Sequence, residues 1–208
     1  FDALVLPTLL KRLTQEAPNI DLGVVPTPKR LADSLETGDV DLAIYPVLLA
    51  PDPFDLDTEV DPELQTRTLF QDSFRCFARA DHPALNRRRL TRKAYAQLDH
   101  VLVSPGGEGP GVVDRELQAE GLQRRIALRV PHFATALEVI RQSDLVLTAP
   151  SSLAQLSTAA MLLSRPAPID LPNHAITMLW HARFTEDPAH RWLRELVLEV
   201  TTMLPSLP

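Results

Sequence analysis

What this sequence of 208 residues lacks excludes several classes of protein. It has a single cysteine, Cys76, so it can form no internal disulfide, as is usual for proteins in a reducing compartment. It has no run of about 18 consecutive apolar residues, the length that a membrane-spanning helix needs. Its start shows no charged segment followed by an apolar core, the pattern of a signal peptide. We therefore expect a cytoplasmic protein.

Basic residues are also in short supply. The chain has 21 Lys and Arg against 27 Asp and Glu, a net charge of −6. Contact with nucleic-acid phosphates needs a basic face, so we expect no nucleic-acid binding by this chain. The acidic excess lies in residues 46–65, which hold six carboxylates, no basic residue and four of the 19 prolines. This segment is predicted to be an extended loop.

No arrangement typical of a metal site or an active site is present. The histidines are scattered, with no pair at i and i+4 and no cysteine partners, so we predict neither metal nor cofactor. Ser104 is not in the G-x-S-x-G context of a hydrolase nucleophile, and no nucleophile–base pair can be named. We therefore do not expect an enzyme.

The spacing of apolar residues predicts alternating helices and strands. Leucines at three- and four-residue spacing predict an amphipathic helix over residues 2–17, and Ile20, Leu22 and Val24 alternate as in a strand. A short helix and a strand over residues 40–44 follow, and a second series of strands and helices begins near residue 91. This order is typical of an α/β fold with helices packed on parallel strands.

Two loops are candidate ligand contacts. Residues 104–111 read SPGGEGPG between a predicted strand and helix, where glycines let backbone N–H groups approach an anion. A plain tight turn explains this loop equally well. His132, Phe133 and Thr135 lie at another strand–helix junction, where an imidazole and an aromatic ring suit an aromatic acid. The alternative places Phe133 in the core.

The order and spacing of several motifs resemble one family over nearly the whole chain. The opening LVLPTLLKRLTQEAPNIDLGVVP, then LADSLETGDVDLAIYP and LFQDSFRCFARADHPAL, resemble the effector-binding domain of LysR-type transcriptional regulators. The ending MLWHARFTEDPAHRWLREL resembles the subgroup of nodulation regulators and regulators of aromatic-compound degradation.

The resemblance implies an α/β fold like that of periplasmic binding proteins. Two Rossmann-like subdomains would be joined by two crossing strands, near residues 78–81 and 167–172, with an effector cleft between them. Subdomain I would comprise residues 1–77 plus 173–208, and subdomain II residues 78–172. The family's N-terminal winged helix-turn-helix has no counterpart here, so we do not expect this chain to bind DNA alone.

The resemblance also implies a function: sensing a small, aromatic molecule and controlling a DNA-binding domain. The effector-binding positions that it implies are Phe1, Asp2, Tyr45, Pro46, Ser104, Gly106, Gly107, His132, Phe133, Thr135, Ala149 and Pro150. A solute-binding protein of a transporter, which would share this fold, is the alternative. On the residues 46–65 loop, we hypothesise that its charge disfavours strongly anionic effectors; the alternative is a solvated loop without that role.

The family pattern further implies a homodimer, and a tetramer of the full-length protein. The first helix and residues 20–25 would contact the partner's helix over residues 112–120. Leu6, Leu10 and Leu13 are therefore either interface or core residues, and the sequence does not distinguish the two.

Overall fold

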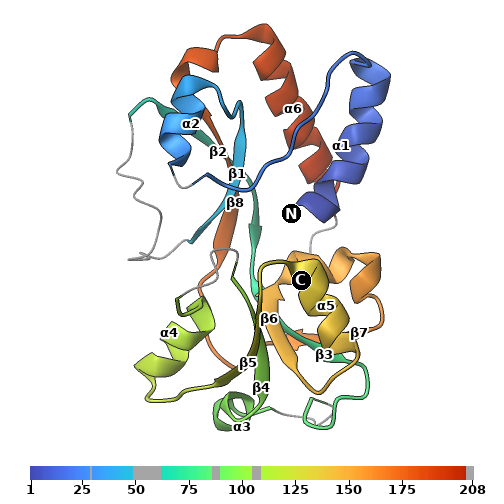
Figure 1. The fold of residues 1–208 in the computed structure, drawn as a ribbon, viewed down its shortest axis with the longest axis vertical. Helices are drawn as coiled ribbons and strands as arrows, with labels where there is room; N and C mark the ends of the chain where they lie inside the picture. The colour runs from blue at the N-terminus through green and yellow to red at the C-terminus, as the bar shows by residue number, and fades with distance from the viewer. Residues whose placement is uncertain (29, 49–61, 86–89, 105–108, 205–208) are drawn as a thin grey trace. The chain divides into compact units, whose positions relative to one another are not determined.

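The computed structural model describes residues 1–28, 30–48, 62–85, 90–104 and 109–204 (Figure 1). Its contacts divide the chain into two compact units. Unit 1 comprises Phe1–Asp72 and Asn173–Pro208, and unit 2 comprises Ser73–Pro172. Each unit is described by itself.

Unit 1 is built on a three-stranded antiparallel sheet of order β1-β8-β2. Strand β8 lies in the middle and is almost entirely buried. Helices α1 and α6 pack side by side on one face, while α2 packs on the other (Figure 1). The elements are α1 (Asp2–Glu16), α2 (Leu31–Thr37), β1 (Ala43–Leu48), β2 (Leu64–Asp72), β8 (His174–His181), η3 (Ala182–Phe184) and α6 (Pro188–Thr202).

Unit 2 is built on a five-stranded mixed sheet of order β5-β4-β6-β3-β7. Strand β4 runs parallel to β5 and β6, whereas β3 runs antiparallel to β6 and β7. Helix α5 packs on one face, and α3 and α4 pack on the other. The elements are β3 (Phe74–Arg79), α3 (Arg92–Ala96), β4 (Asp99–Val103), α4 (Val112–Ala119), β5 (Arg125–Val130), α5 (Phe133–Arg141), β6 (Val146–Pro150), η1 (Ser151–Gln155), η2 (Ser157–Ala159) and β7 (Leu162–Pro166).

Local sequence explains where several helices begin and end. The Thr91 hydroxyl accepts a hydrogen bond from the Ala94 N–H and so caps the start of α3. At the start of α6 the Asp187 carboxylate accepts from the His190 N–H, at 2.7 Å. Helix α2 ends at Gly38, whose φ of 83° lies in the left-handed region that glycine adopts without strain.

The prediction of a strand over residues 20–24 is wrong, because the structure has no strand there. This segment pairs with no strand in the described part of unit 1. Its apolar side chains are exposed: Ile20 by 50%, Leu22 by 39% and Val24 by 54%. Alternation predicts a strand only where a sheet face receives the apolar side, and here none does. For the same reason no parallel βαβ unit forms in this part of unit 1.

The acidic loop is shorter than predicted. Residues 46–48 belong to β1, where Pro46 faces Ile176 of β8, and Leu64 and Gln65 begin β2. Proline lacks a backbone N–H and is tolerated in an edge strand, and β1 pairs only with β8 among the described strands. Residues 49–61, which make up most of the acidic segment, lie outside the described residues. The hypothesis that the charge of this segment disfavours anionic effectors concerns these residues.

The boundary between the units falls between Asp72 and Ser73, not between residues 77 and 78 as expected. Strand β3 belongs wholly to unit 2 because Phe74–Phe77 pair with β6 and Arg75–Arg79 pair with β7. The residues expected to form the first crossing, 78–81, therefore lie inside unit 2. The second boundary between the units falls between Pro172 and Asn173. No helix in the described ranges is long and apolar enough to cross a membrane.

Candidate functional site

The carboxyl ends of three neighbouring parallel strands meet at one edge of the unit 2 sheet. Val103 of β4 lies opposite Val130 of β5, and β4 also pairs in parallel with β6. The Ser104 N–H donates to the Val130 carbonyl at 2.9 Å, so the segments leaving β4 and β5 are held together. Ligands of open α/β sheets bind at this edge. Of the predicted site residues of unit 2, Ser104 follows β4, His132 follows β5, and Ala149 and Pro150 end β6.

Helix α5 begins at this edge with an exposed histidine. His132 is the N-cap of α5 in an extended conformation, and its side chain caps no backbone N–H. The side chains of His132 and Thr135 are exposed. Phe133 is half-buried and packs against the core beneath α5, so the alternative that placed it in the core accounts for much of its surface. The free imidazole therefore lies where the helix N-terminus favours negative charge.

Helix α4 begins at the same edge, after the glycine-rich loop. The Gly109 carbonyl accepts from Arg129 Nη1 at 2.9 Å, and the Gly111 N–H donates to the Asp114 carboxylate at 2.7 Å. Gly111 is the N-cap of α4 and has no side chain to cap it. Residues 105–108, which include the predicted site residues Gly106 and Gly107, lie outside the described residues.

Strand β6 contributes less than expected. Ala149 is only 1% exposed, and its side chain belongs to the core cluster beneath α5. It can therefore present only backbone atoms to a ligand. Pro150, the last residue of the strand, is half-buried. The alternation of side chains along β6 could have predicted this burial, because Ala149 lies on the same face of the strand as the buried Leu147 two residues earlier.

The four site residues predicted in unit 1 do not gather on one face. The Phe1 ring stacks on Phe70 with centroids 6.4 Å apart, on the α1–α6 face of the sheet. Tyr45 packs against the cluster on the opposite face, beneath α2. Asp2 is exposed in the first turn of α1, and Pro46 is exposed in β1.

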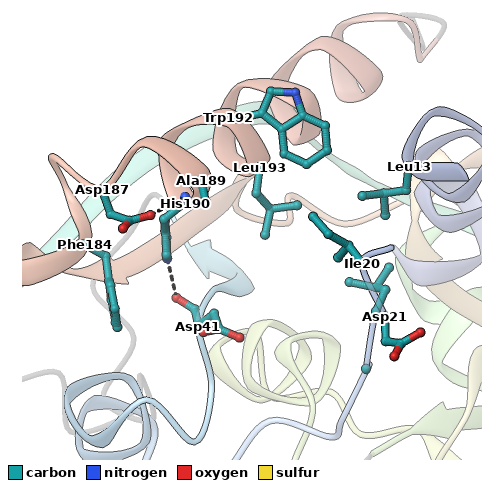
Figure 2. A pocket seen from close by; sticks show the side chains of 12 residues that line it. Leu13, Ile20, Asp21, Asp41, Phe184, Asp187, Ala189, His190, Trp192 and Leu193 are labelled. Atoms are coloured by element: carbon teal, nitrogen blue, oxygen red, sulfur yellow. Dashed lines mark hydrogen bonds between the residues drawn. The ribbon is translucent and has the colours of Figure 1, made fainter. Parts of the chain in front are cut away.

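Unit 1 instead holds a pocket of about 310 Å³ that the sequence did not predict (Figure 2). Trp192 and Leu193 on α6 form one wall, and Ile20 and Leu13 form the opposite one (Figure 2). Two sequence features could have indicated this pocket: the apolar side of the helix that carries Trp192, and the alternating segment over residues 20–24 that pairs with no described strand. The lining residues are Leu13, Ile20, Asp21, Leu22, Gly23, Asp41, Phe184, Asp187, Ala189, His190, Trp192 and Leu193.

The polar residues that line this pocket are three aspartates and His190, and His190 is hydrogen-bonded within the protein. His190 Nε2 lies 2.8 Å from the Asp41 carbonyl (Figure 2), and its Nδ1 lies 2.6 Å from Arg194 Nη1. The buried Arg194 also donates to the carbonyls of Phe184 and Thr185, so it faces away from the carboxylates of the pocket. The described lining residues include three aspartates and no lysine or arginine. Such a lining repels an anion, so we do not assign an acidic effector to this pocket.

Three buried titratable groups of unit 2, His100, Cys76 and Tyr95, are held in their neutral forms. Burial and, to a smaller extent, the nearby charge of Arg124 together lower the pKa of His100 to about 4. Burial raises the pKa of the Cys76 thiol to about 12 and also raises that of Tyr95, whose hydroxyl lies 2.6 Å from Thr148 Oγ1. A thiol with so high a pKa is a poor nucleophile. Within the described ranges no group of three potential ligands could hold a metal ion.

Comparison with known proteins gives a consistent result over nearly the whole chain. The family model described as LysR substrate binding domain matches residues 1–202. The transcriptional activators NagR of a Ralstonia species and NahR of Pseudomonas putida are 35% and 36% identical over 201 and 203 residues. These matches cover 94% and 95% of this chain but only 62% and 63% of the two relatives. The solved regulatory domain of MexT, a transcriptional activator in Pseudomonas aeruginosa, superposes with a TM-score of 0.75 at 27% identity, covering 96% of this chain and 94% of that one.

Proposed function

Because this chain belongs to the LysR family as its substrate-binding domain, as its motifs led us to expect, we propose that it is the effector-sensing and oligomerising part of a transcriptional regulator. The fold is that of LysR regulatory domains, which is periplasmic-binding-protein-like. The matched relatives are named as transcriptional activators, not as enzymes or transporter components. A cytoplasmic location, and a DNA-binding domain elsewhere in the full protein, belong to this proposal.

The observation that carries the proposal is the shared edge of β4, β5 and β6. We place effector contacts there at Ser104, His132, Thr135 and the backbone of Pro150. Gly106 and Gly107, which lie outside the described residues, stay predictions from the family pattern. The half-buried Phe133 contributes the exposed part of its ring. Phe1, Asp2, Tyr45 and Pro46 stay predictions from the family pattern, and Ala149 would contribute backbone atoms alone.

The chemistry of this edge favours a small aromatic acid. Helix α5 begins there, the side chain of its N-cap residue His132 does not cap it, and its N-terminus carries a partial positive charge. At the start of α4, the Gly111 N–H is already bound by the Asp114 carboxylate. His132 can donate to a carboxylate, and an aromatic ring next to it suits an apolar ligand body. Binding regulates the full protein only if the effector has different affinities for its two states.

A thermal-shift screen with benzoate, hydroxybenzoates and flavonoids tests the function. A compound present at about 100 times its Kd should add about 2.7 kcal/mol to the free energy of unfolding. We expect at least one aromatic acid to give such a shift. No shift from any of them, at concentrations up to the millimolar range, would contradict the proposal.

His132→Ala should raise the Kd of the acid found in that screen by roughly 10- to 100-fold. This factor corresponds to the loss of one hydrogen bond to a charged group, which contributes about 1.5–3 kcal/mol. Calorimetry measures the Kd. The side chain is exposed and caps nothing, so the melting temperature without ligand should not change. Gln142→Ala, at the other end of α5, is the control and should bind normally. Equal affinity in both variants would remove His132 from the site.

We also propose that the domain dimerises through α1 and residues 20–25, as the family pattern implies. Five exposed large apolar side chains lie in this stretch: Leu10, Ile20, Leu22, Val24 and Val25. Leu13 is 2% exposed and belongs to the core of unit 1, whereas Leu10 is 53% exposed and is available for the interface that we propose. Leu6 is half-buried against the core of unit 1.

Leu10→Glu should therefore raise the dimer dissociation constant by about 10-fold or more, because it places a charge in an apolar interface. Sedimentation equilibrium measures the constant. Met161→Glu, at an exposed residue of unit 2, is the control and should leave the dimer intact. A Leu10→Glu variant that dimerises like the wild type would exclude α1 from the interface.

A further inference from the structure

A buried arginine of unit 2 immediately precedes β5, at the end of the strands opposite to the proposed effector edge, and its side chain reaches the first turn of α4. The Arg124 side chain is 2% exposed, and it lies between the end of α4 and the start of β5. Its Nε donates to Asp114 Oδ1 at 2.7 Å and its Nη2 donates to Asp114 Oδ2 at 3.1 Å. Burying a guanidinium is costly unless its geometry is good and its donors are satisfied, as this two-pronged contact provides.

The carboxylate that Arg124 holds has a second partner, at the end of the glycine-rich loop. The same Oδ2 of Asp114 accepts the Gly111 N–H at 2.7 Å. Burial alone would raise the pKa of Asp114, but the hydrogen bond and charge of Arg124 outweigh it and lower that pKa. Asp114 therefore stays ionised and binds the Gly111 N–H through a charged acceptor.

Gly111 is closely packed at this point. A Cβ built there would lie 2.9 Å from Leu102 Cδ1 of β4 and 3.3 Å from Asp114 Oδ2. The loop end is therefore pressed against the strand from which the loop departs. A shift of the Asp114 carboxylate would move this backbone, and with it the first N–H groups of α4.

A third contact joins the arginine to β4 itself. Arg124 Nη1 lies 3.4 Å from His100 Nδ1, and His100 Nε2 lies 3.0 Å from the Tyr95 carbonyl. The Nε2–H therefore donates to that carbonyl, and Nδ1 is left as the acceptor that faces Arg124. One guanidinium thus connects α4, β4 and the chain entering β5.

We propose that Arg124 is a positioning residue for the effector site: through Asp114 it fixes Gly111, and so sets where the glycine-rich loop ends and α4 begins. The inference rests on the proposed function, since it assumes that this edge contacts the effector. Lysine cannot replace this arginine, because an ammonium lacks the planar fork that holds both carboxylate oxygens.

Arg124→Lys tests the proposal with two independent measurements, amide hydrogen exchange at Gly111 and the Kd of benzoate by calorimetry. We expect protection of the Gly111 amide to fall about 10-fold or more and the Kd to rise by a similar factor. Arg125→Lys is the control, because the neighbouring Arg125 pairs with Asp99 at the surface and should give wild-type values. A structural role alone would lower stability without a selective loss at Gly111.

Other outcomes overturn the proposal. Unchanged Gly111 protection in Arg124→Lys shows that the loop end does not depend on the arginine, and lost protection with an unchanged Kd shows that its position is irrelevant to binding. If Arg124→Lys does not fold, Asp114→Asn makes the same test, because it retains the shape and loses the charged acceptor. Failure of the wild type to bind benzoate or any acid of the screen contradicts the proposed function, and the Gly111 measurement then decides the positioning role alone.

Discussion

Leu137→Ala should lower the free energy of unfolding of unit 2 by about 2–5 kcal/mol, the usual cost of removing a fully buried leucine side chain. Leu137 is 1% exposed and lies on the buried side of α5, in the cluster with Val101 and Leu147. The same helix presents His132 and Thr135 on its exposed side. The cavity should therefore weaken the support of the effector edge without removing any proposed contact.

Urea unfolding followed by far-UV circular dichroism measures the loss. Both tryptophans, Trp180 and Trp192, lie in unit 1, so their fluorescence reports separately on that unit. Thr135→Ala, an exposed position two residues earlier, is the matched control and should change stability by no more than about 0.5 kcal/mol. A loss below about 1 kcal/mol in Leu137→Ala would mean that α5 does not pack on the sheet as described.

Lowering the pH from 7 to 4 should destabilise the domain by about 3 kcal/mol through His100 alone. Its pKa is about 4 in the folded chain, mainly because of burial, against about 6.5 when unfolded. The unfolded chain therefore binds more protons between these values, and stability falls as the pH falls through this window. Burial also lowers the pKa of His174 in unit 1, which adds to the loss with the same sign.

Urea titrations at pH 7, 6, 5 and 4 measure this dependence. His100→Asn should be less stable at pH 7, because it disturbs the contacts with Tyr95 and Arg124, but its stability should fall less steeply with pH. In the wild type the imidazole signals of His100 should not titrate above about pH 5. Parallel pH curves for the two proteins would show that His100 is not the group responsible.

The sequence predicted the order of elements well where burial follows local pattern. The strands β4, β5 and β6 and the helix α5 follow the alternation of strands and helices that the apolar spacing predicts after residue 91. Residues 20–24 show the limit of this reasoning, because alternation is a property of the segment whereas pairing depends on a neighbour. The boundary after Asp72 could not be derived for the same reason, since β3 is assigned to unit 2 by partners about 70 and 90 residues away.

The candidate site was predictable only in its strand ends. His132 and Ser104 each follow a parallel strand. The carboxyl ends of neighbouring parallel strands lie at the same edge of a sheet, so the α/β order alone predicts that these two residues lie there. The buried contact of Arg124 with Asp114 was not predicted, since a charged residue in a polar stretch reads as surface. The acidic pocket of unit 1 was also missed, because it is formed by residues from α1, the segment after it and α6.

The central place of β8 has a consequence for biosynthesis. Strand β8 pairs with both β1 and β2. The unit 1 sheet therefore cannot form until β8 has been translated, because Ala43 of β1, for example, pairs with Leu179 of β8. Unit 2 is one continuous stretch, Ser73–Pro172, and is complete on the ribosome before β8 has been translated. The residues of unit 1 that precede unit 2 in the sequence therefore complete their sheet only after unit 2 has been translated. Until then α1 and β2 leave the ribosome with apolar faces uncovered, which makes them natural clients for chaperones.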